Sequence, residues 1–342
     1  MTEAALAALL GLGTGIALGL AARIGEFCTL GAIESAAYAG NQRRARLWGI
    51  VLGTAVIATY ALAAAGQIDL SATLYHRVAW NPWASVIGGL IFGYGMAYAG
   101  NCGFGALARL GGGDLRSLVV VIVIGISGFM TLSGPLAMAR LHLFPTQPAD
   151  TFQGLAHAVP GIPPVVIALG VGIVLICLAL AHGPLRERPK QIAWGVVAGL
   201  AFAAAFWGTS HLHEQSFGEI PVEGHTFTAP IGRSILFLMT SSGGGLGFAV
   251  GSVFGVIAGA FLGARIKGLF RWEACEDPRE LGRQVFGAML MGIGGVIALG
   301  CSVGQGVSAV ATLAWSGPVT LAAIIIGTLL GLRHLISGFQ PG

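Results

Sequence analysis

Three of the five cysteines are followed, three positions later, by a glycine. A thiol is a weak hydrogen-bond donor with a polarisable sulfur atom, so it suits a ligand that carries a sulfur atom of its own. Cysteines that share one local pattern could therefore bind such a ligand at several points in succession. The pairs are Cys28 with Gly31, Cys102 with Gly105, and Cys301 with Gly304.

The two other cysteines lack this pattern, because Leu180 and Pro278 stand where the glycine would be. Cys177 lies in an apolar segment, and we expect it to be a small core residue. Cys275 lies among charged residues, and we expect it to be an incidental exposed thiol.

Two of the three motifs belong to a longer internal repeat. Segment 93–107, GYGMAYAGNCGFGAL, falls into register with segment 292–306, GIGGVIALGCSVGQG. A weaker match joins segment 49–58 to segment 251–260. The repeat predicts that Cys102 and Cys301 occupy equivalent places in two halves of the protein.

The composition predicts an all-α integral membrane protein that forms a single transmembrane domain over residues 1–342. Only 9% of the residues are charged, 55% are hydrophobic and 56 are glycine. A soluble protein of this length needs a more charged surface, whereas glycine lets membrane helices pack closely. The net charge of +4 lies in the connections and does not indicate nucleic-acid binding.

Apolar windows long enough to cross a bilayer number about nine. The N-terminus lacks the positive region of a cleaved signal peptide, so the first window is expected to remain as a span. Fifteen of the 18 Lys and Arg residues follow the odd-numbered windows, which predicts a periplasmic N-terminus and a cytoplasmic C-terminus. The windows are 4–22, 47–66, 82–100, 117–140, 162–182, 191–209, 246–266, 282–300 and 317–337.

The two repeated segments lie in the third and eighth windows and would cross the membrane in opposite directions. We therefore expect a 4+1+4 inverted repeat, with repeat one at about 1–141, a linking helix at about 160–184 and repeat two at about 190–338. Transporters are commonly built in this way, with the substrate between the two units near the midplane.

Three connections are too apolar to be ordinary loops, and we expect re-entrant loops bent inward, each followed by a short helix. They cover 24–40, 101–113 and 300–314; a fourth is expected near 227–232, where Thr228 replaces the cysteine. A thiol and free backbone N–H groups at a helix start can bind an anion weakly enough for passage. The predicted site residues are Cys28, Cys102, Cys301, Gly31, Gly105, Gly304 and Thr228.

With these motifs the chain resembles the YeeE/YedE family of bacterial inner-membrane transporters of sulfur compounds, whose best known members take up thiosulfate. The resemblance implies an hourglass-shaped protein of nine spans, no enzyme activity and no cofactor. It also implies that the thiols of Cys28, Cys102 and Cys301 pass thiosulfate along by S–H contacts. Because the chain ends at Gly342, a cytoplasmic sulfurtransferase-like partner would be a separate protein.

Other functions stay open at this point. Related proteins are associated with other sulfur or selenium species. A membrane thiol-disulfide oxidoreductase would need a Cys102–Cys301 disulfide, but the chain has no Cys-x-x-Cys pair. A soft-metal transporter would use the thiols as ligands with few methionines or paired histidines to assist them.

Several further residues attract attention but have simpler explanations. His211 and His213 fit no strong zinc spacing, so no metal site is expected. Three glycines at positions 11, 13 and 15 lie in an apolar window and predict close helix packing, not nucleotide binding. Glu26 and Glu34 flank the first cysteine loop, and Arg23 is near enough to Glu26 to pair with it. Arg109 could bind an anion at the inner exit or anchor a helix end.

Overall fold

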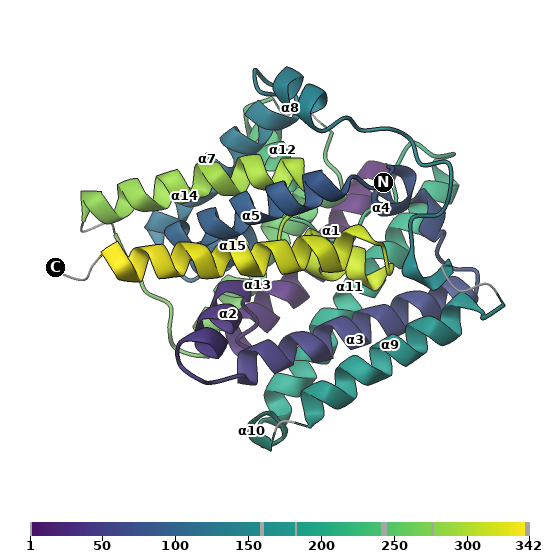
Figure 1. Ribbon diagram of the computed structural model, residues 1–342, viewed down its shortest axis with the longest axis horizontal. Helices are drawn as coiled ribbons and strands as arrows, with labels where there is room; N and C mark the ends of the chain where they lie inside the picture. The colour runs from purple at the N-terminus through teal and green to yellow at the C-terminus, as the bar shows by residue number, and fades with distance from the viewer. Residues whose placement is uncertain (1, 158–160, 182, 241–244, 275–276, 339–342) are drawn as a thin grey trace.

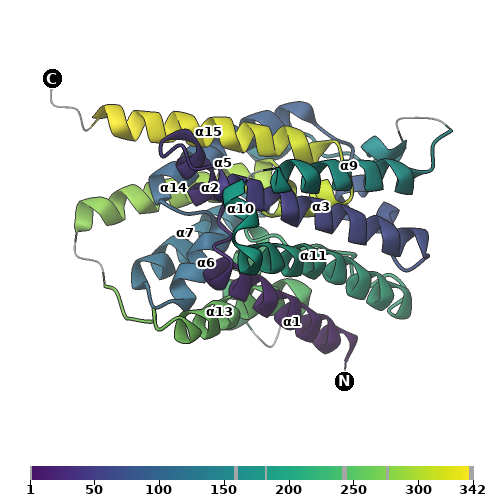
Figure 2. The ribbon, with the colours of Figure 1, turned by 90° about the horizontal axis from the view of Figure 1, so that it is seen from below.

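The computed structural model describes residues 2–157, 161–181, 183–240, 245–274 and 277–338, and these residues form helices and loops without a named strand. The prediction of an all-α protein is confirmed. The chain termini lie at opposite ends of the helical bundle (Figures 1 and 2). The long helices are α1 (Glu3–Ile24), α3 (Arg43–Ala64), α5 (Pro82–Ala99), α7 (Leu115–Leu132), α9 (Pro164–Leu180), α11 (Pro189–Gln215), α13 (Phe248–Ile266), α14 (Pro278–Ile297) and α15 (Ser316–Gly338).

Among the described residues, six helical segments are long and apolar enough to cross a membrane. They contain α1, α3, α7, α11, α13 and α15. Helix α9 has 17 residues, and α5 and α14 carry the repeated glycine-rich segments and fall outside the six. Each of the nine expected windows contains one long helix. That all nine of these helices cross the membrane stays a prediction.

Short helices follow the four expected loops. They are α2 (Thr29–Ala37), α6 (Gly103–Gly111), α12 (Ala229–Met239) and η3 (Gly304–Ala309), a π-helix. That these loops bend into the bilayer stays a prediction. Other short helices, η1 (Leu70–Ala72), α4 (Leu74–Arg77), α8 (Ala137–Leu143), η2 (Leu155–His157) and α10 (Gly183–Arg186), lie in the connections.

One expected span is shorter than its window. Helix α7 ends at Leu132, and α8 begins separately at Ala137. Ser133, Gly134 and Pro135 lie between them, and the proline disfavours helical backbone in the residue before it. The window 117–140 therefore contains one long helix and the start of a second, short one.

Helix packing follows a pattern of exchanged pairs. Helix α1 packs on α13 as α11 packs on α3, and α5 packs on α15 as α14 packs on α7. Helix α1 also packs on α11, and α5 also packs on α14. If each helix of the first half is replaced by its counterpart in the second half, the same contacts result. The counterparts are α1 and α11, α3 and α13, α5 and α14, and α7 and α15. The boundaries of the two repeats stay a prediction.

Glycines let helices α1 and α13 approach closely. A Cβ atom on Gly11 would lie 2.2 Å from the Phe248 carbonyl oxygen, and one on Gly15 would lie 2.6 Å from that of Ser252. Gly13 has nothing within 4 Å of that position. The predicted role in helix packing is therefore confirmed for Gly11 and Gly15, and Gly13 takes no part in it.

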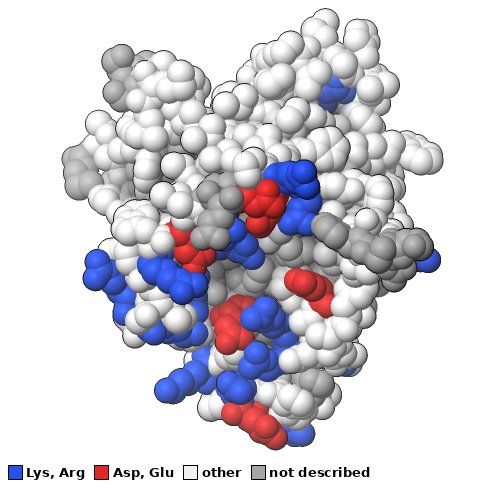
Figure 3. All heavy atoms as spheres, turned by 90° about the vertical axis from the view of Figure 1, so that its left-hand side faces the viewer, with Lys and Arg blue, Asp and Glu red and all other residues white. Residues whose placement is uncertain are grey.

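Charged side chains gather at the end of the bundle where the C-terminus lies (Figure 3). Lys and Arg are mixed there with Asp and Glu, while the flanks above them are uncharged over wide areas. The elements at this end include the connections that the charge pattern predicts to be cytoplasmic.

Candidate functional site

A predicted site residue precedes each of the four short helices. Cys28 stands before α2, Cys102 before α6 and Thr228 before α12, each at the N-cap, and Cys301 lies three residues before η3. Cys102 is 0% exposed and Cys301 1% exposed, whereas Cys28 is half-buried. The structure therefore places two of the thiols inside the protein and one nearer its surface.

The spacing of cysteine and glycine corresponds to a helix-capping geometry. The Gly105 N–H donates to the Cys102 sulfur at 3.3 Å, and the Gly304 N–H donates to the Cys301 sulfur at 3.4 Å. An N-cap side chain commonly accepts a hydrogen bond from the third residue of the helix, whose N–H has no partner within the helix. The motif thus fixes each of these thiols against a backbone donor.

The backbone turns in the same way before all three cysteines. Glu26, Gly100 and Leu299 each lie two residues before a cysteine, and their φ angles are 61°, 72° and 56°. Glycine adopts positive φ freely, whereas glutamate and leucine do so at a cost of about 1 kcal/mol or more. Strain that is retained at matching positions is typical of functional segments.

Cys301 lies against the segment that precedes α12. The Phe227 N–H donates to its sulfur at 3.3 Å, and the Thr226 hydroxyl lies 3.7 Å from it. The adjacent Thr228 is buried, and its hydroxyl would lie 2.5 Å from a Cβ atom on Gly295 of α14. The fourth loop and the Cys301 motif therefore form one group.

Cys102 lies between the two other cysteine motifs. Its sulfur is 3.8 Å from the Thr29 hydroxyl, and that hydroxyl is 3.2 Å from the Ser302 hydroxyl. Thr29 follows Cys28 and Ser302 follows Cys301, so side chains next to both motifs meet beside the central thiol.

Buried aromatic rings connect the loops that hold these thiols. Ring centroids are 5.9 Å apart for Phe27 and Phe104, and 5.3 Å apart for Phe104 and Phe227. Trp48 of α3 extends the row at 5.0 Å from Phe27. These rings and the two hydroxyls are not among the site residues predicted from the sequence, although all but Trp48 lie within two residues of one.

A cavity of about 730 Å³ lies beside this site, and its lining includes Leu74, Tyr75 and Arg77 of α4. Thr226, Thr228 and Gly300 line it, and so do the cationic residues Arg77 and Arg233. Arg233 forms an ion pair of 3.1 Å with Glu223. The cavity therefore joins a region with basic side chains to residues that contact or precede Cys301.

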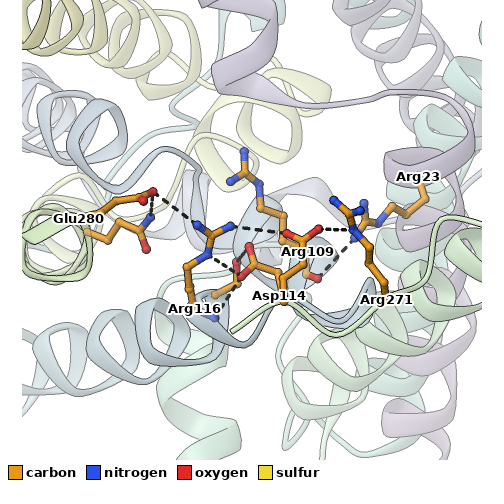
Figure 4. Close-up of polar contacts among 9 residues, drawn as sticks. Arg23, Arg109, Asp114, Arg116, Arg271 and Glu280 are labelled. Atoms are coloured by element: carbon orange, nitrogen blue, oxygen red, sulfur yellow. Dashed lines mark hydrogen bonds and ion pairs between the residues drawn. The ribbon is translucent and has the colours of Figure 1, made fainter. Parts of the chain in front are cut away.

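The opposite end of α6 is capped by an arginine of α1 (Figure 4). Arg23 donates to the carbonyl oxygens of Ala108 at 3.1 Å and Arg109 at 3.4 Å. The suggested pairing of Arg23 with Glu26 is wrong. Glu26 lies in the left-handed turn after α1, and its carboxylate bonds at 2.9 Å to Arg43 at the start of α3.

An ion-pair network joins the start of α7 to the connection before α14. Arg116 lies 3.3 Å from Asp114, 3.5 Å from Glu273 and 3.7 Å from Glu280 (Figure 4). Backbone bonds add to it, since the Leu115 N–H donates to the Glu273 carbonyl oxygen at 3.0 Å. These contacts hold the turn between α6 and α7 in place.

The remaining candidates lie away from the site. Cys177 is exposed on α9, so the prediction of a core residue is wrong: its side chain faces outward from a helix at the edge of the bundle. Cys275 lies outside the described residues. His211 bonds to Gln215, and His213 bonds to the Ile220 carbonyl oxygen. No group of three His, Cys, Asp or Glu residues in the described part of the chain could hold a metal ion.

Comparison with known proteins identifies the family of this chain. A family model described as sulphur transport matches residues 24–330. The chain is 26% identical to the thiosulfate transporter TsuA of Escherichia coli (strain K12), over 93% of this chain and 92% of the relative. It is also 26% identical to TsuA of Spirochaeta thermophila (strain ATCC 700085 / DSM 6578 / Z-1203), over 71% and 74% of the two chains. The resemblance to sulfur-compound transporters is thus confirmed, and this multi-pass membrane protein belongs to the sulphur transport family.

Proposed function

We propose that the protein takes up thiosulfate across the bacterial inner membrane through a central pathway formed by Cys28, Cys102 and Cys301. The observation that carries the proposal is the position of Cys102, whose thiol lies 3.8 Å from the Thr29 hydroxyl, which in turn lies 3.2 Å from the Ser302 hydroxyl. The names of the relatives support thiosulfate as the transported ion.

The chemistry of the pathway suits an anion with a terminal sulfur. Thiosulfate presents a soft sulfur atom at one end and three oxygens at the other. Thiols are polarisable weak donors that suit the sulfur, and the backbone N–H groups of Gly105, Phe227 and Gly304 lie beside them. Neutral donors bind an anion without the full countercharge that would trap it.

The predicted topology assigns the two ends of the pathway to opposite sides of the membrane. With the N-terminus in the periplasm and the C-terminus in the cytoplasm, the cavity beside Thr226 opens outward and Cys28 lies on the inner side. The two units of the inverted 4+1+4 repeat would then enclose the pathway. Glycines 31, 105 and 304 and Thr228 let the loops approach the ion.

Energetics require a driving force for this uptake. Moving two negative charges inward against an inside-negative potential costs about 4.6 kcal/mol per 100 mV. Uptake must therefore be coupled to cations or followed by rapid consumption of the ion. A separate sulfurtransferase-like protein in the cytoplasm would be one such consumer.

The test is uptake of labelled thiosulfate into proteoliposomes. Cys28→Ala, Cys102→Ala and Cys301→Ala should each lower uptake about tenfold or more, since a hydrogen bond to a charged group contributes roughly 1.5 kcal/mol or more. Cys177→Ala, which changes an exposed thiol on α9, should leave uptake unchanged. Normal uptake in the first three variants would exclude the thiol pathway.

A competition assay then identifies the transported species. Unlabelled thiosulfate should compete fully, whereas sulfate, which has no terminal sulfur, should compete weakly from the outer side. Stronger competition by a selenium-containing or another sulfur-containing anion would reassign the substrate and leave the pathway intact.

A further inference from the structure

The three Cys-x-x-Gly motifs differ in what lies next to their glycines. A Cβ atom on Gly304 would lie 2.5 Å from the Thr226 hydroxyl, and one on Gly105 would have nothing nearer than 3.4 Å. On Gly31 it would lie 2.8 Å from a guanidinium nitrogen of Arg44. Of the three motifs, the one that contains Cys28 is therefore the one where glycine makes room for a cation.

The Arg44 guanidinium and the Cys28 thiol lie on the same side of Gly31. The Cys28 sulfur is 3.7 Å from the position that a Cβ atom on Gly31 would take, so both groups are within 4 Å of that point. An arginine that only anchored a helix end at the membrane surface would have no need of this close approach. The glycine thus brings a positive charge to the thiol.

Arg44 keeps most of its hydrogen-bonding capacity. Its ion pair with Glu26 is long, at 3.7 Å, and the same carboxylate oxygen bonds to Arg43 at 2.9 Å. The side chain of Arg44 is 40% exposed. Since a guanidinium group has five N–H donors, several remain for an anion that arrives from outside or inside the protein.

A second arginine acts on the same thiol from another helix. The charges of Arg109 in the last turn of α6 and of Arg44 in α3 both act on Cys28. Figure 4 shows the Arg109 side chain turned away from Asp114, and no dashed line reaches its guanidinium group. The charge of a second guanidinium group, from a different element, therefore adds to that of Arg44 at this half-buried thiol.

We propose that Arg44, Arg109 and the Cys28 thiol form a binding site for divalent sulfur oxyanions at the inner end of the pathway. Guanidinium groups bind the oxygens of such anions through charge-assisted hydrogen bonds, often two at a time. The site rests on the proposed function for its place at the end of uptake. Because its arginines contact oxygens, it accepts sulfate as well as thiosulfate, in contrast to the thiols deeper in the pathway.

Thiol modification tests the site without any transport measurement. The purified full chain carries Cys177→Ser and Cys275→Ser and is treated with anionic sulfonatoethyl or cationic trimethylammonioethyl methanethiosulfonate. Peptide mass spectrometry gives the rate of mixed-disulfide formation at Cys28 for each reagent. The ratio of the anionic to the cationic rate reports the local charge, because a change in the thiol itself affects both reagents alike.

Removing either arginine should lower this ratio about tenfold, the lower end of the effect that charged surfaces have on association rates. The variants are Arg44→Gln and Arg109→Gln, and Arg44→Lys should keep most of the ratio because it keeps the charge. Arg333→Gln, an exposed arginine in α15, is the matched control and should change nothing. Equal ratios in the original protein and in both glutamine variants would overturn the proposal.

Protection by sulfate tests the ligand class. Sulfate at millimolar concentration should slow modification of Cys28 in the protein with both arginines and should fail to do so in Arg44→Gln. Sodium chloride at the same ionic strength is the control, because it screens the arginine charges equally but cannot bind as a divalent oxyanion does. Equal protection by chloride would contradict a specific site. Absence of thiosulfate uptake by the original protein, together with the expected modification ratios, would count against the proposed function and not against this site.

Discussion

The hydroxyl oxygens of Thr29 and Ser302 lie 3.2 Å apart, which joins the residue after Cys28 to the residue after Cys301. Both side chains are buried, and the Thr29 hydroxyl is also 3.8 Å from the Cys102 sulfur. A polar contact thus closes the space beside the central thiol. An anion at Cys102 would replace this contact with hydrogen bonds to its own oxygens.

Removing one of these hydroxyls should weaken binding of the transported ion. Thr29→Val and Ser302→Ala each remove a donor to an anion, which is worth roughly 1.5 kcal/mol or an increase of about tenfold in KM. Thr29→Ser should restore the original value because it retains the hydroxyl. Uptake kinetics in proteoliposomes measure the effect.

The control for this series is Thr59→Val, since Thr59 is equally buried and its hydroxyl has no hydrogen-bond partner among the residues that the structure describes. This variant should keep KM within about twofold, because valine has nearly the same shape and no bond is lost. An equal rise in KM for Thr59→Val and Thr29→Val would mean that packing, not the hydroxyl, is responsible.

The glycines of two motifs should respond differently to a single methyl group. Gly304→Ala would place a Cβ atom 2.5 Å from the Thr226 hydroxyl and displace it from Cys301, with a loss of stability of about 1–3 kcal/mol and a large fall in uptake. Gly105→Ala meets no protein atom nearer than 3.4 Å and should keep its melting temperature, so a fall in its uptake would reflect hindrance of the ion. Melting temperature and uptake of the two variants decide the matter. Similar losses of stability in the two variants would show that the motif requires glycine for its backbone conformation and not for the space beside it.

Local geometry at the site could be predicted from the sequence, whereas contacts between distant segments could not. The spacing of Cys102 and Gly105 reflects a hydrogen bond across one helical turn, which a short motif can specify. The contact of Thr29 with Ser302 joins residues 273 positions apart and depends on how the loops pack. Glu26 shows the same limit, because the direction of the turn at its positive φ decides that it meets Arg43 and not Arg23.

The Arg116 network should contribute modestly to stability. Arg116→Gln removes ion pairs to three carboxylates from a side chain that is 27% exposed, and we expect a loss of about 1 kcal/mol and a fall of a few degrees in melting temperature. High salt should reduce the difference. Arg271→Gln is the control, because Arg271 shares the Glu273 partner but is 80% exposed and should have almost no effect.

Acid should destabilise the connection between α3 and α5 through His76. This residue lies in α4, and its ring stacks on that of Phe152 with the ring centroids 3.8 Å apart. Its Nε2 atom lies 3.2 Å from the Thr312 carbonyl oxygen. Burial lowers the pKa of His76 from 6.5 to about 4, and the nearby His157 adds to the effect. The unfolded chain therefore binds a proton at this residue at a higher pH than the folded protein does.

Stability should be unaffected by this group above pH 6.5 and should fall between pH 6.5 and 4, by roughly 3 kcal/mol at most. His76→Gln should flatten the melting temperature over this range in purified protein, while His211→Gln, an exposed residue, should not. An equally steep fall in the His76→Gln variant would assign the pH dependence to another group.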